Sequence, residues 1–187
     1  MAHKICPWWL GYFLISPLRS WFGGSPERQV TPYVKTGMTV LEPGPGMGFF
    51  TLPMARLAGA GGRVVAVDIQ EKMLDKLHAR AAKAGLSDRI ETRLARPDSL
   101  GVSDLAGAVD FVLAFAMVHE LPSAERFFQE MAAALKPGGF LLLAEPSGHV
   151  TGEQFELELK LAEAAGLHVE ARPAIRRSHG ALLKMQG

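Results

Sequence analysis

The stretch Thr39–Phe50, TVLEPGPGMGFF, decides the fold of this chain. The apolar run from Met38 to Leu41 predicts a buried strand, and a helical pattern begins at Phe49. Between them stand the acidic residue Glu42 and three glycines at every second position. Glycine has no Cβ atom and tolerates positive φ angles, so such a turn lets the backbone approach a ligand closely. The following helix start adds unpaired N–H groups and a positive dipole. The stretch therefore predicts a strand, a glycine loop and a helix that together hold a small ligand.

The composition predicts one globular domain. The chain has 187 residues, of which 48% are hydrophobic and 21% are charged, so it can bury a full core. Its 20 Lys and Arg residues balance 19 Asp and Glu residues, which gives no net field that would attract nucleic acid. The single cysteine, Cys6, excludes an internal disulfide and indicates a reducing compartment. We therefore expect a cytoplasmic protein with no nucleic-acid partner.

Residues 1–24 differ from the rest of the chain and are assigned separately from a domain over residues 25–187. The run Pro7–Ile15 is very apolar. It is much shorter than the ~20 residues that cross a bilayer. No small-residue cleavage site follows it. We expect a lid or packed segment, and the alternatives are weak membrane association through residues 5–22 or a cleaved signal.

Apolar strands alternate with amphipathic helices along the remainder of the chain. Further strands are predicted at residues 63–68, 90–94, 110–115, 140–144, 167–171 and 181–185. Helices are predicted from Pro26 and at residues 49–58, 71–84, 124–135 and 153–165, with a turn at residues 136–139. This alternation predicts an α/β fold whose largely parallel sheet is covered on both faces. The last two strands should be antiparallel, because the loop between them is too short for a helix.

Polar residues stand at or just after several predicted strand ends. They are Glu42, Asp68, Asp98, His119 and Glu145. In sheets of this kind, ligands bind at the carboxyl ends of the strands. The sequence therefore predicts a ligand site at that edge of the sheet.

The glycine spacing and Glu42 favour a cationic nucleoside over a dinucleotide. A dinucleotide loop has the pattern G-x-G-x-x-G, and Phe49 occupies its third glycine position. Asp68, 22 residues after Gly46, suits hydrogen bonds to ribose hydroxyls. A carboxylate at Glu42 would repel a diphosphate. S-adenosylmethionine fits these features, because it carries adenosine and positive charge but no phosphate.

Five segments of the chain, in order, resemble motifs of the class I S-adenosylmethionine-dependent methyltransferases. They are Val40–Gly48, Val65–Asp68, Arg96–Ser99, Asp110–Ala114 and Leu135–Gly139. The resemblance covers about residues 25–185 and is broadest to enzymes of the small-molecule type that act on quinones, arsenite and other metabolites. It implies a Rossmann-like, doubly wound sheet of seven strands in the order 3-2-1-4-5-7-6, with strand seven antiparallel.

The resemblance also implies S-adenosylmethionine as the cofactor and assigns its site. It makes Asp68 the ribose ligand and Asp98 the residue near the adenine amino group, and Glu42 is expected near the amino-acid end. The implied cofactor-binding residues are Glu42, Gly44, Pro45, Gly46, Asp68, Ile69, Asp98, Ser99 and Ala114. The Asn/Asp-Pro-Pro-aromatic signature of nucleic-acid amino-methyltransferases is absent at residues 116–121, which favours a small-molecule acceptor.

His119 is the candidate catalytic residue. Methyl transfer depends mainly on alignment in a site that excludes water. An acceptor with an O–H or N–H group also needs a base, and His119 stands just after the strand at 110–115. A local hydrogen-bonding role is the alternative for this histidine. The aromatic residues that could line the site are Trp8, Trp9, Tyr12, Phe49 and Phe115.

Two further groups of polar residues are not assigned to a metal or substrate site. His119, Glu120, Glu145 and His149 could converge on a divalent cation, but they lack the Asp and Asn ligands of the metal-using relatives, so no metal is expected. The loop Arg172–His179 carries several cationic side chains and is interpreted as a solvated turn rather than a site for an anionic substrate.

Two other functions stay open at this point. One is an NAD-dependent oxidoreductase on the same topology, against which Glu42 and Phe49 argue. The other is a non-catalytic cofactor-binding or membrane-peripheral protein, suggested by the apolar N-terminal segment.

Overall fold

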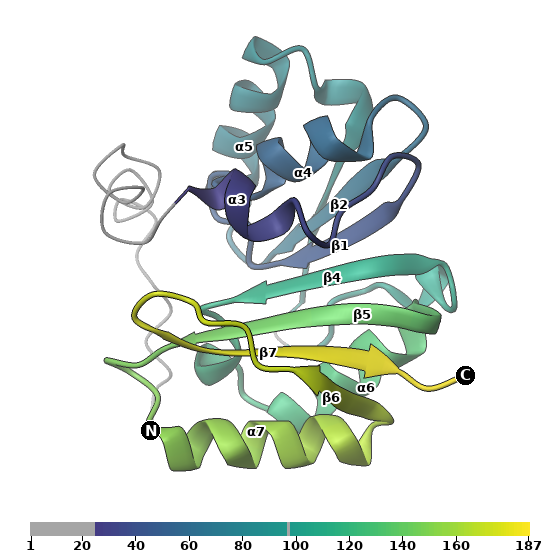
Figure 1. Cartoon of the computed structure of the whole chain (residues 1–187). Helices are drawn as coiled ribbons and strands as arrows, with labels where there is room; N and C mark the ends of the chain where they lie inside the picture. Colours follow the sequence, from purple (N-terminus) through teal and green to yellow (C-terminus); the bar gives the residue numbers. More distant parts are fainter. Residues whose placement is uncertain (1–24, 97) are drawn as a thin grey trace. The chain divides into compact units, whose positions relative to one another are not determined.

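A computed structural model describes residues 25–96 and 98–187, which form two compact units, residues 25–100 and 101–187 (Figure 1). The strands belong to one seven-stranded sheet in the order β3-β2-β1-β4-β5-β7-β6, flanked by helices. The last strand, β7, runs antiparallel to β5 and to β6. The predicted sheet order and the antiparallel strand seven are thus confirmed. The expected lid and its aromatic residues at 1–24 lie outside the described residues.

The first unit is a parallel three-stranded part of the sheet with its helices. Its elements are α3 (Pro26–Val30), β1 (Thr39–Pro43), α4 (Thr51–Ala58), β2 (Arg63–Asp68), α5 (Glu71–Lys83), the short helix η1 (Ser87–Arg89) and β3 (Ile90–Leu94). Strand β2 pairs in parallel with β1 and with β3. Helix α4 packs on β1 and β2, and α5 packs on β2 and β3. The interior of β2 is entirely apolar and buried, which is typical of a strand covered on both faces.

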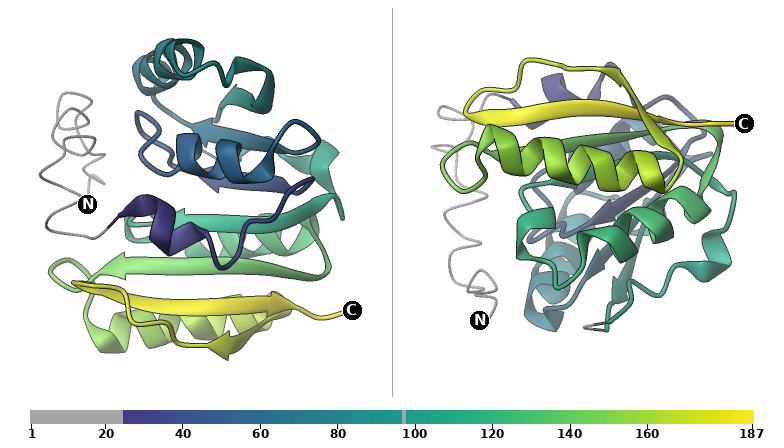
Figure 2. Two further views of the ribbon diagram at one scale, coloured as in Figure 1. Left: turned by 45° about the horizontal axis from the view of Figure 1, so that its top comes forward. Right: turned by 90° about the horizontal axis from the view of Figure 1, so that it is seen from below.

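The second unit contains the other four strands. Its elements are η2 (Ser103–Leu105), β4 (Val109–Phe115), η3 (Val118–Glu120), α6 (Ala124–Ala134), β5 (Leu135–Pro146), α7 (Gly152–Ala164), β6 (Leu167–Ala171) and β7 (Ser178–Met185). Helices α6 and α7 pack against each other, as Figure 2 shows from below. Both begin with capping residues. Ser123 accepts a hydrogen bond from the N–H of Arg126, and Thr151 forms a capping box with Gln154.

The predicted turn before the fifth strand lies within β5 itself. Val109 of β4 pairs with Leu135, whereas the next matched residue, Phe111, pairs with Phe140. Residues 136–139 are therefore an insertion in the β5 side of the ladder. Proline lacks an N–H donor, and Gly138 adopts a φ of +77°, so this Lys-Pro-Gly-Gly segment bulges while pairing resumes on either side.

Two predicted boundaries also shift for physical reasons. Helix α4 begins at Thr51 rather than Phe49, because the glycine loop continues as turns through Phe50. Strand β7 begins at Ser178 rather than Ala181, because its first residues pair with the end of β5, Ser178 opposite Pro146. The ladder with β5 therefore extends β7 beyond its apolar run.

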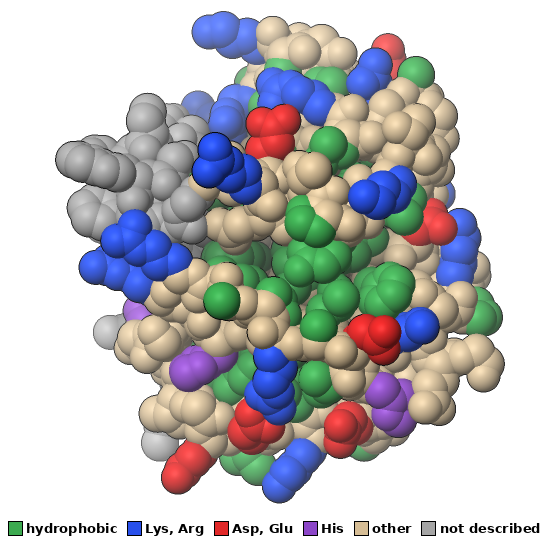
Figure 3. Space-filling view, viewed as in Figure 1, with side chains coloured by type: hydrophobic (Ala, Val, Ile, Leu, Met, Phe, Trp, Pro, Cys, Tyr) green, Lys and Arg blue, Asp and Glu red, His purple; other side chains and the backbone are tan. Residues whose placement is uncertain are grey.

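Acidic and basic side chains are interspersed on the face of the molecule drawn in Figure 3. This pattern agrees with the near balance of 20 basic and 19 acidic residues.

Among residues 25–96 and 98–187, no helix combines the length and the apolar character that a bilayer crossing requires.

Candidate functional site

The glycine loop after β1 holds two glycines with different roles. Gly46 has a φ of +54° and Gly48 a φ of +86°. A Cβ atom at Gly48 would lie 2.4 Å from Cδ1 of Leu77 and 2.8 Å from Cδ1 of Leu52, so the absence of a side chain here makes room for these two leucines. A Cβ atom at Gly46 would meet no atom of the described residues within 4 Å. The space beside Gly46 is therefore where the loop backbone is open to a ligand.

Glu42 lies at the end of β1, and its carboxylate is held inside the fold. The residue is 3% exposed, and its Oε2 accepts a hydrogen bond of 2.5 Å from the hydroxyl of Thr51, the first residue of α4. This bond joins the strand end to the helix start across the glycine loop. It also orients a buried carboxyl group at the base of the loop. The sequence analysis placed Glu42 near the amino-acid end of the cofactor but did not predict its contact with Thr51.

The loop backbone is fixed at two further points. The N–H of Gly44 donates to the carbonyl of Val67 over 2.9 Å, which ties the loop to β2. The guanidinium of Arg80 on α5 donates to the carbonyl of Met47. Burial lowers the pKa of Arg80, and the nearby charge of Arg56 lowers it further. Sequence reasoning missed Arg80, because nothing in a helix pattern marks a residue that contacts a distant loop.

Asp68 ends β2 beside the glycine loop, and the Asp98 loop follows β3 on the other side of β2. The strand register pairs Pro43 with Val67 and Asp68 with Leu94, so the ends of β1, β2 and β3 are level. Asp68 is 8% exposed, and its Oδ1 accepts a hydrogen bond of 2.9 Å from the N–H of Gln70. The structure therefore brings the predicted strand-end residues of this unit to one edge of its three strands.

The remaining predicted cofactor residues of this unit differ in exposure. Ile69, next to Asp68, is one of the few large apolar side chains with substantial exposure, at 39%. Asp98 and Ser99 are exposed in a tight turn, in which the backbones of Arg96 and Ser99 exchange hydrogen bonds of 3.0 and 3.3 Å. Pro45 is buried. An exposed isoleucine beside a buried aspartate is a suitable surface for one face of a flat base.

In the second unit, the chain turns sharply after β4. Ala116 adopts a φ of +57°, which is uncommon for a residue with a side chain, and its N–H donates to the carbonyl of Ala144 over 2.7 Å. This turn leads into η3, which carries His119. Ala114 lies within β4 opposite Leu143 and is fully buried, and its assignment to the cofactor stays a prediction.

His119 forms a hydrogen-bonded pair with Glu145, the second-last residue of β5. The Nδ1 atom of His119 bonds Oε2 of Glu145, and Oε1 of Glu145 accepts the N–H groups of Met117 at 3.2 Å and Val118 at 2.8 Å. Glu145 has no exposed surface. A carboxylate only accepts hydrogen bonds, so Nδ1 is the donor and Nε2 carries the free lone pair of neutral His119.

The surroundings of His119 raise its pKa above the ordinary value. The hydrogen bond to Glu145 is the largest cause, burial opposes it, and the charges of Glu145, Glu120 and Glu158 add to it. Oε1 of Glu120 lies 3.9 Å from Nε2, and the ring of His149 stands edge-on with its centroid 5.6 Å away. The side chain of His119 keeps 19% exposure. It is therefore a partly accessible base held by a buried carboxylate.

The sequence model of the methyltransferase domain family matches residues 41–143, from the end of β1 to β5. The chain belongs to this family. An arsenite methyltransferase of Halobacterium salinarum is 31% identical over 109 residues, which are 58% of this chain and 27% of that protein. A ubiquinone biosynthesis O-methyltransferase of Caulobacter vibrioides is 35% identical over 108 residues, which are 58% of this chain and 40% of that protein. The chain thus spans well under half the length of these two relatives.

Solved structures with the methyltransferase fold cover most of the chain. An S-adenosylmethionine-dependent methyltransferase from Aquifex aeolicus has a TM-score of 0.85 and 25% identity, covering 97% of this chain and 100% of the other. The [4+2]-cyclase SpnF has a TM-score of 0.71 at 18% identity, covering 86% of this chain and 79% of the other, and shares the fold. The family and the Aquifex neighbour imply S-adenosylmethionine as the cofactor. They do not favour the NAD-dependent alternative.

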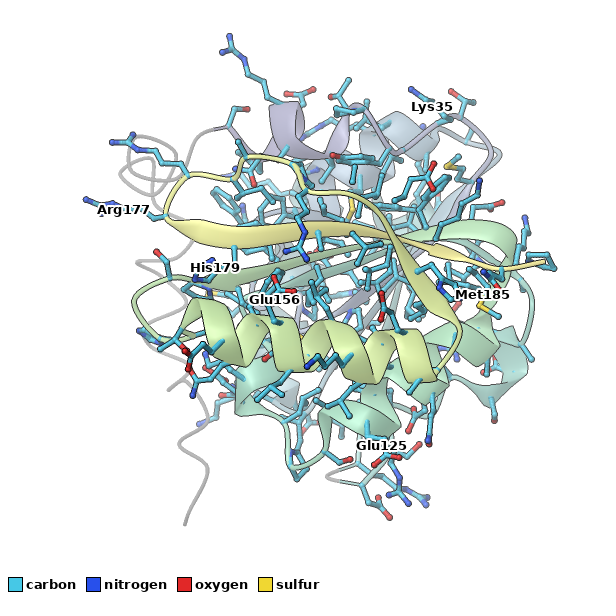
Figure 4. The ribbon with its side chains drawn as sticks, turned by 60° about the horizontal axis from the view of Figure 1, so that its bottom comes forward. Lys35, Glu125, Glu156, Arg177, His179 and Met185 are labelled. Carbon is cyan, nitrogen blue, oxygen red and sulfur yellow. The ribbon has the colours of Figure 1, made fainter. Side chains whose placement is uncertain are left out.

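The cationic loop of the methyltransferase domain, Arg172–His179, is engaged with α7. Arg172 forms a bidentate pair with Glu156, with N–O distances of 2.6 and 2.9 Å. The ring of His179 stacks on Phe155 at 5.5 Å. Figure 4 shows Glu156 on α7, His179 on β7, and Arg177 projecting outward from the loop. These contacts agree with the interpretation of a solvated turn.

The possible cation set of the sequence analysis does not assemble as a metal site. Within the described part of the chain, no group of three or more His, Cys, Asp or Glu side chains is placed to hold a metal ion. Glu145 instead serves His119 and two backbone N–H groups. The sequence analysis marked Glu145 as a strand-end acid and as a member of the possible cation set. Both His119 and Glu145 follow the ends of neighbouring predicted strands, which is the signal in the sequence for their pairing.

Proposed function

We propose that this chain is an S-adenosylmethionine-dependent methyltransferase that transfers a methyl group to a small-molecule acceptor. The observation that carries this proposal is the open space beside Gly46, which lies in a loop between the buried carboxylates of Glu42 and Asp68. Methyltransferase-domain membership supports it. The names of two relatives, an arsenite methyltransferase and a ubiquinone biosynthesis O-methyltransferase, support a small acceptor for this chain as well.

The residues of the loop fit this cofactor better than a dinucleotide. Glu42 and Asp68 supply two carboxylates, which suit a cationic ligand and ribose hydroxyls and disfavour a diphosphate. The exposed Ile69 supplies an apolar surface for adenine, and Asp98 and Ser99 follow the level end of β3. We assign Gly44, Pro45 and Gly46 to backbone contact with the ligand, and we keep Ala114 as a cofactor-binding residue that the resemblance implies. The cofactor would be held by these residues.

In methyl transfer, the glycine loop and Asp68 would bind the cofactor, and His119 with Glu145 would act on the acceptor. Bound S-adenosylmethionine supplies an electrophilic methyl group. The glycine loop and Asp68 orient the ligand, which is the main contribution of a protein to an in-line displacement. His119 accepts a proton at Nε2 from an acceptor O–H or N–H group, and Glu145 holds the ring in the tautomer that leaves Nε2 free.

An Asp68→Asn variant tests the cofactor assignment. The amide keeps an oxygen that can accept from the N–H of Gln70, so the start of α5 stays formed, but the charge that binds ribose hydroxyls is lost. We expect the affinity for S-adenosylmethionine to fall by roughly 1–3 kcal/mol in isothermal titration calorimetry. Asp75→Asn, at an exposed position of α5, is the matched control and should bind as the unaltered chain does. Equal affinities of all three proteins would remove Asp68 from the site.

Incubation of the full chain with methyl-labelled S-adenosylmethionine and a fractionated metabolite extract tests the function itself. The expected result is a labelled product whose mass exceeds that of its acceptor by one methylene unit. A protein that binds the cofactor but labels no fraction would support the non-catalytic alternative. Turnover of a nicotinamide cofactor at 340 nm would support the oxidoreductase alternative.

We also propose that residues 1–24 are a lid or peripheral segment of a cytoplasmic protein. The support is the apolar run Pro7–Ile15 in the sequence. Co-sedimentation with anionic lipid vesicles, with and without residues 1–22, separates the two roles. A lid predicts equal sedimentation of both proteins, whereas a peripheral segment predicts that only the full chain sediments.

A further inference from the structure

We propose that Arg80 is a positioning residue for S-adenosylmethionine, because it holds the glycine loop from α5 in the conformation that binds the ligand. The inference rests on the proposed function, in which this loop binds the cofactor. It assigns no contact between Arg80 and the ligand itself. The residues that carry it all lie in the first unit, residues 25–100.

Arg80 reaches the glycine loop from a distant part of the sequence. Its Nη1 donates a hydrogen bond to the carbonyl of Met47, 33 residues earlier in the chain. The guanidinium is always charged, so this bond belongs to the stronger, charge-assisted class. Burial first, and then the charge of Arg56, lower the pKa of Arg80, and neither influence comes from an acidic neighbour. A half-buried cation costs desolvation energy, and here a backbone carbonyl of the loop offsets part of that cost.

Helix α5 holds two successive residues of the loop. Leu77 and Arg80 stand three positions apart, so they lie on the same face of α5. Arg80 binds the carbonyl of Met47, and Cδ1 of Leu77 lies where a side chain of Gly48 would begin, 2.4 Å from its Cβ position. The side chain of Met47 is itself 2% exposed. The peptide between Met47 and Gly48 is therefore fixed against α5 by a hydrogen bond and by packing.

The same peptide is also held from its other side. It is a trans peptide, so the N–H of Gly48 points away from the carbonyl of Met47. This N–H donates to the carbonyl of Pro45 over 3.0 Å, which closes the turn around Gly46. Gly46 has a φ of +54°, and a Cβ atom there would meet no atom of the described residues within 4 Å. Arg80 thus fixes the backbone on one side of Gly46, while the open face of Gly46 stays available.

A loop that is ordered before the ligand arrives binds it more tightly. Glycine loses more backbone freedom on ordering than any other residue, and this loop contains Gly44, Gly46 and Gly48. If the ligand itself had to order the loop, that entropy cost would reduce its affinity. The bond from Arg80 makes the ordering part of folding. Loss of this bond should therefore weaken cofactor binding, although no contact with the ligand is removed.

Nuclear magnetic resonance of one labelled peptide tests the contact without any ligand. The pair Met-Gly occurs once in the sequence, at Met47–Gly48. Labelling with ¹³C at methionine carbonyls and ¹⁵N at glycine therefore gives a single cross peak, which reports the peptide that Arg80 holds. In the full chain we expect Arg80→Met to move this peak, because the carbonyl loses its donor. An unmoved peak in Arg80→Met would overturn the proposal.

Lys83→Met is the matched control for Arg80→Met. Arg80 and Lys83 both stand in the last turn of α5, so each variant removes one positive charge from the same helix end. Lys83 is exposed, and its replacement should leave the cross peak in place. Arg80→Lys keeps the charge and a donor, so its peak should lie nearer to that of the unaltered chain.

Calorimetric titration with S-adenosylmethionine tests the effect on binding. The affinity should fall about tenfold in Arg80→Met, which corresponds to the loss of one hydrogen bond to a charged group. Arg80→Lys should recover most of this affinity, and Lys83→Met should bind as the unaltered chain does. Affinity should follow the cross peak across the four proteins. Unchanged affinity in a variant whose peak has moved, or lost affinity in one whose peak has not, would overturn the positioning role.

The unaltered chain separates this inference from the proposed function. If it does not bind S-adenosylmethionine, the proposed function is contradicted and the positioning role with it. If it binds and Arg80→Met binds equally well, the positioning role alone is contradicted. Urea unfolding of the same proteins identifies a merely structural role for Arg80, which would lower the unfolding midpoint and leave the affinity of the folded protein unchanged.

Discussion

Replacement of His119 by glutamine should lower kcat for methyl transfer to an ionisable acceptor by about 10²- to 10⁴-fold, the usual contribution of a general base. Glutamine retains a donor for Glu145 but has no titratable nitrogen to accept the acceptor's proton. The affinity for S-adenosylmethionine should stay the same, because the proposed cofactor residues other than Ala114 lie in residues 25–100. The measurement is a comparison of kcat and of calorimetric affinity between the unaltered chain and the variant.

The matched control for His119→Gln is His78→Gln, at an exposed position of α5. It should keep both kcat and affinity. If His119→Gln retains the kcat of the unaltered chain with an O–H or N–H acceptor, the histidine has the local hydrogen-bonding role instead. The pair with Glu145 would then serve the turn after β4, where Ala116 holds its unusual φ.

Alanine at Gly48 should mainly reduce stability, whereas alanine at Gly46 should mainly reduce cofactor affinity. At Gly48, a methyl group would clash with Leu77 and Leu52 at 2.4 and 2.8 Å, and the φ of +86° is unfavourable for alanine. We expect Gly48→Ala to reduce the free energy of unfolding by roughly 2–4 kcal/mol, from overpacking and backbone strain together. Urea unfolding monitored by circular dichroism measures this loss.

Gly46→Ala is the matched variant in the same loop. Its φ of +54° and the absence of neighbours within 4 Å predict a stability loss of only about 1–2 kcal/mol. Its methyl group would occupy the space that we assign to the ligand, so affinity for S-adenosylmethionine should fall by tenfold or more. A Gly46→Ala protein that binds the cofactor as the unaltered chain does would place the ligand elsewhere.

The sequence predicted the sheet well because strand and helix patterns in this chain are local. Strand β2 is an uninterrupted apolar run that ends at Asp68, and the short loop before β7 forced an antiparallel hairpin. The structure of residues 136–139 was harder to predict from the sequence. Its proline and glycines indicate a turn, but the pairing of Leu135 with Val109 extends the strand through it, and such pairing depends on a distant part of the chain.

The sequence only hints at the side-chain contacts of the second unit. His119 and Glu145 come from separate elements, and their place after neighbouring predicted strands is the one signal of their hydrogen bond. Glu158 falls between Phe155 and Leu159 on the stripe of α7 that faces the core. Its alternation with neighbouring leucines in the sequence ELELKL hid this stripe. The Thr51 hydroxyl on Glu42 was likewise invisible, since threonine at a helix start usually serves its own backbone.

Calorimetric titration of the full chain with S-adenosylmethionine, and separately with NADH, tests the central claim most directly. The buried carboxylate of Glu42 beneath an open glycine loop predicts saturable binding of S-adenosylmethionine with one molecule per chain and no binding of NADH. Tight binding of NADH, or no binding of S-adenosylmethionine, would contradict the account.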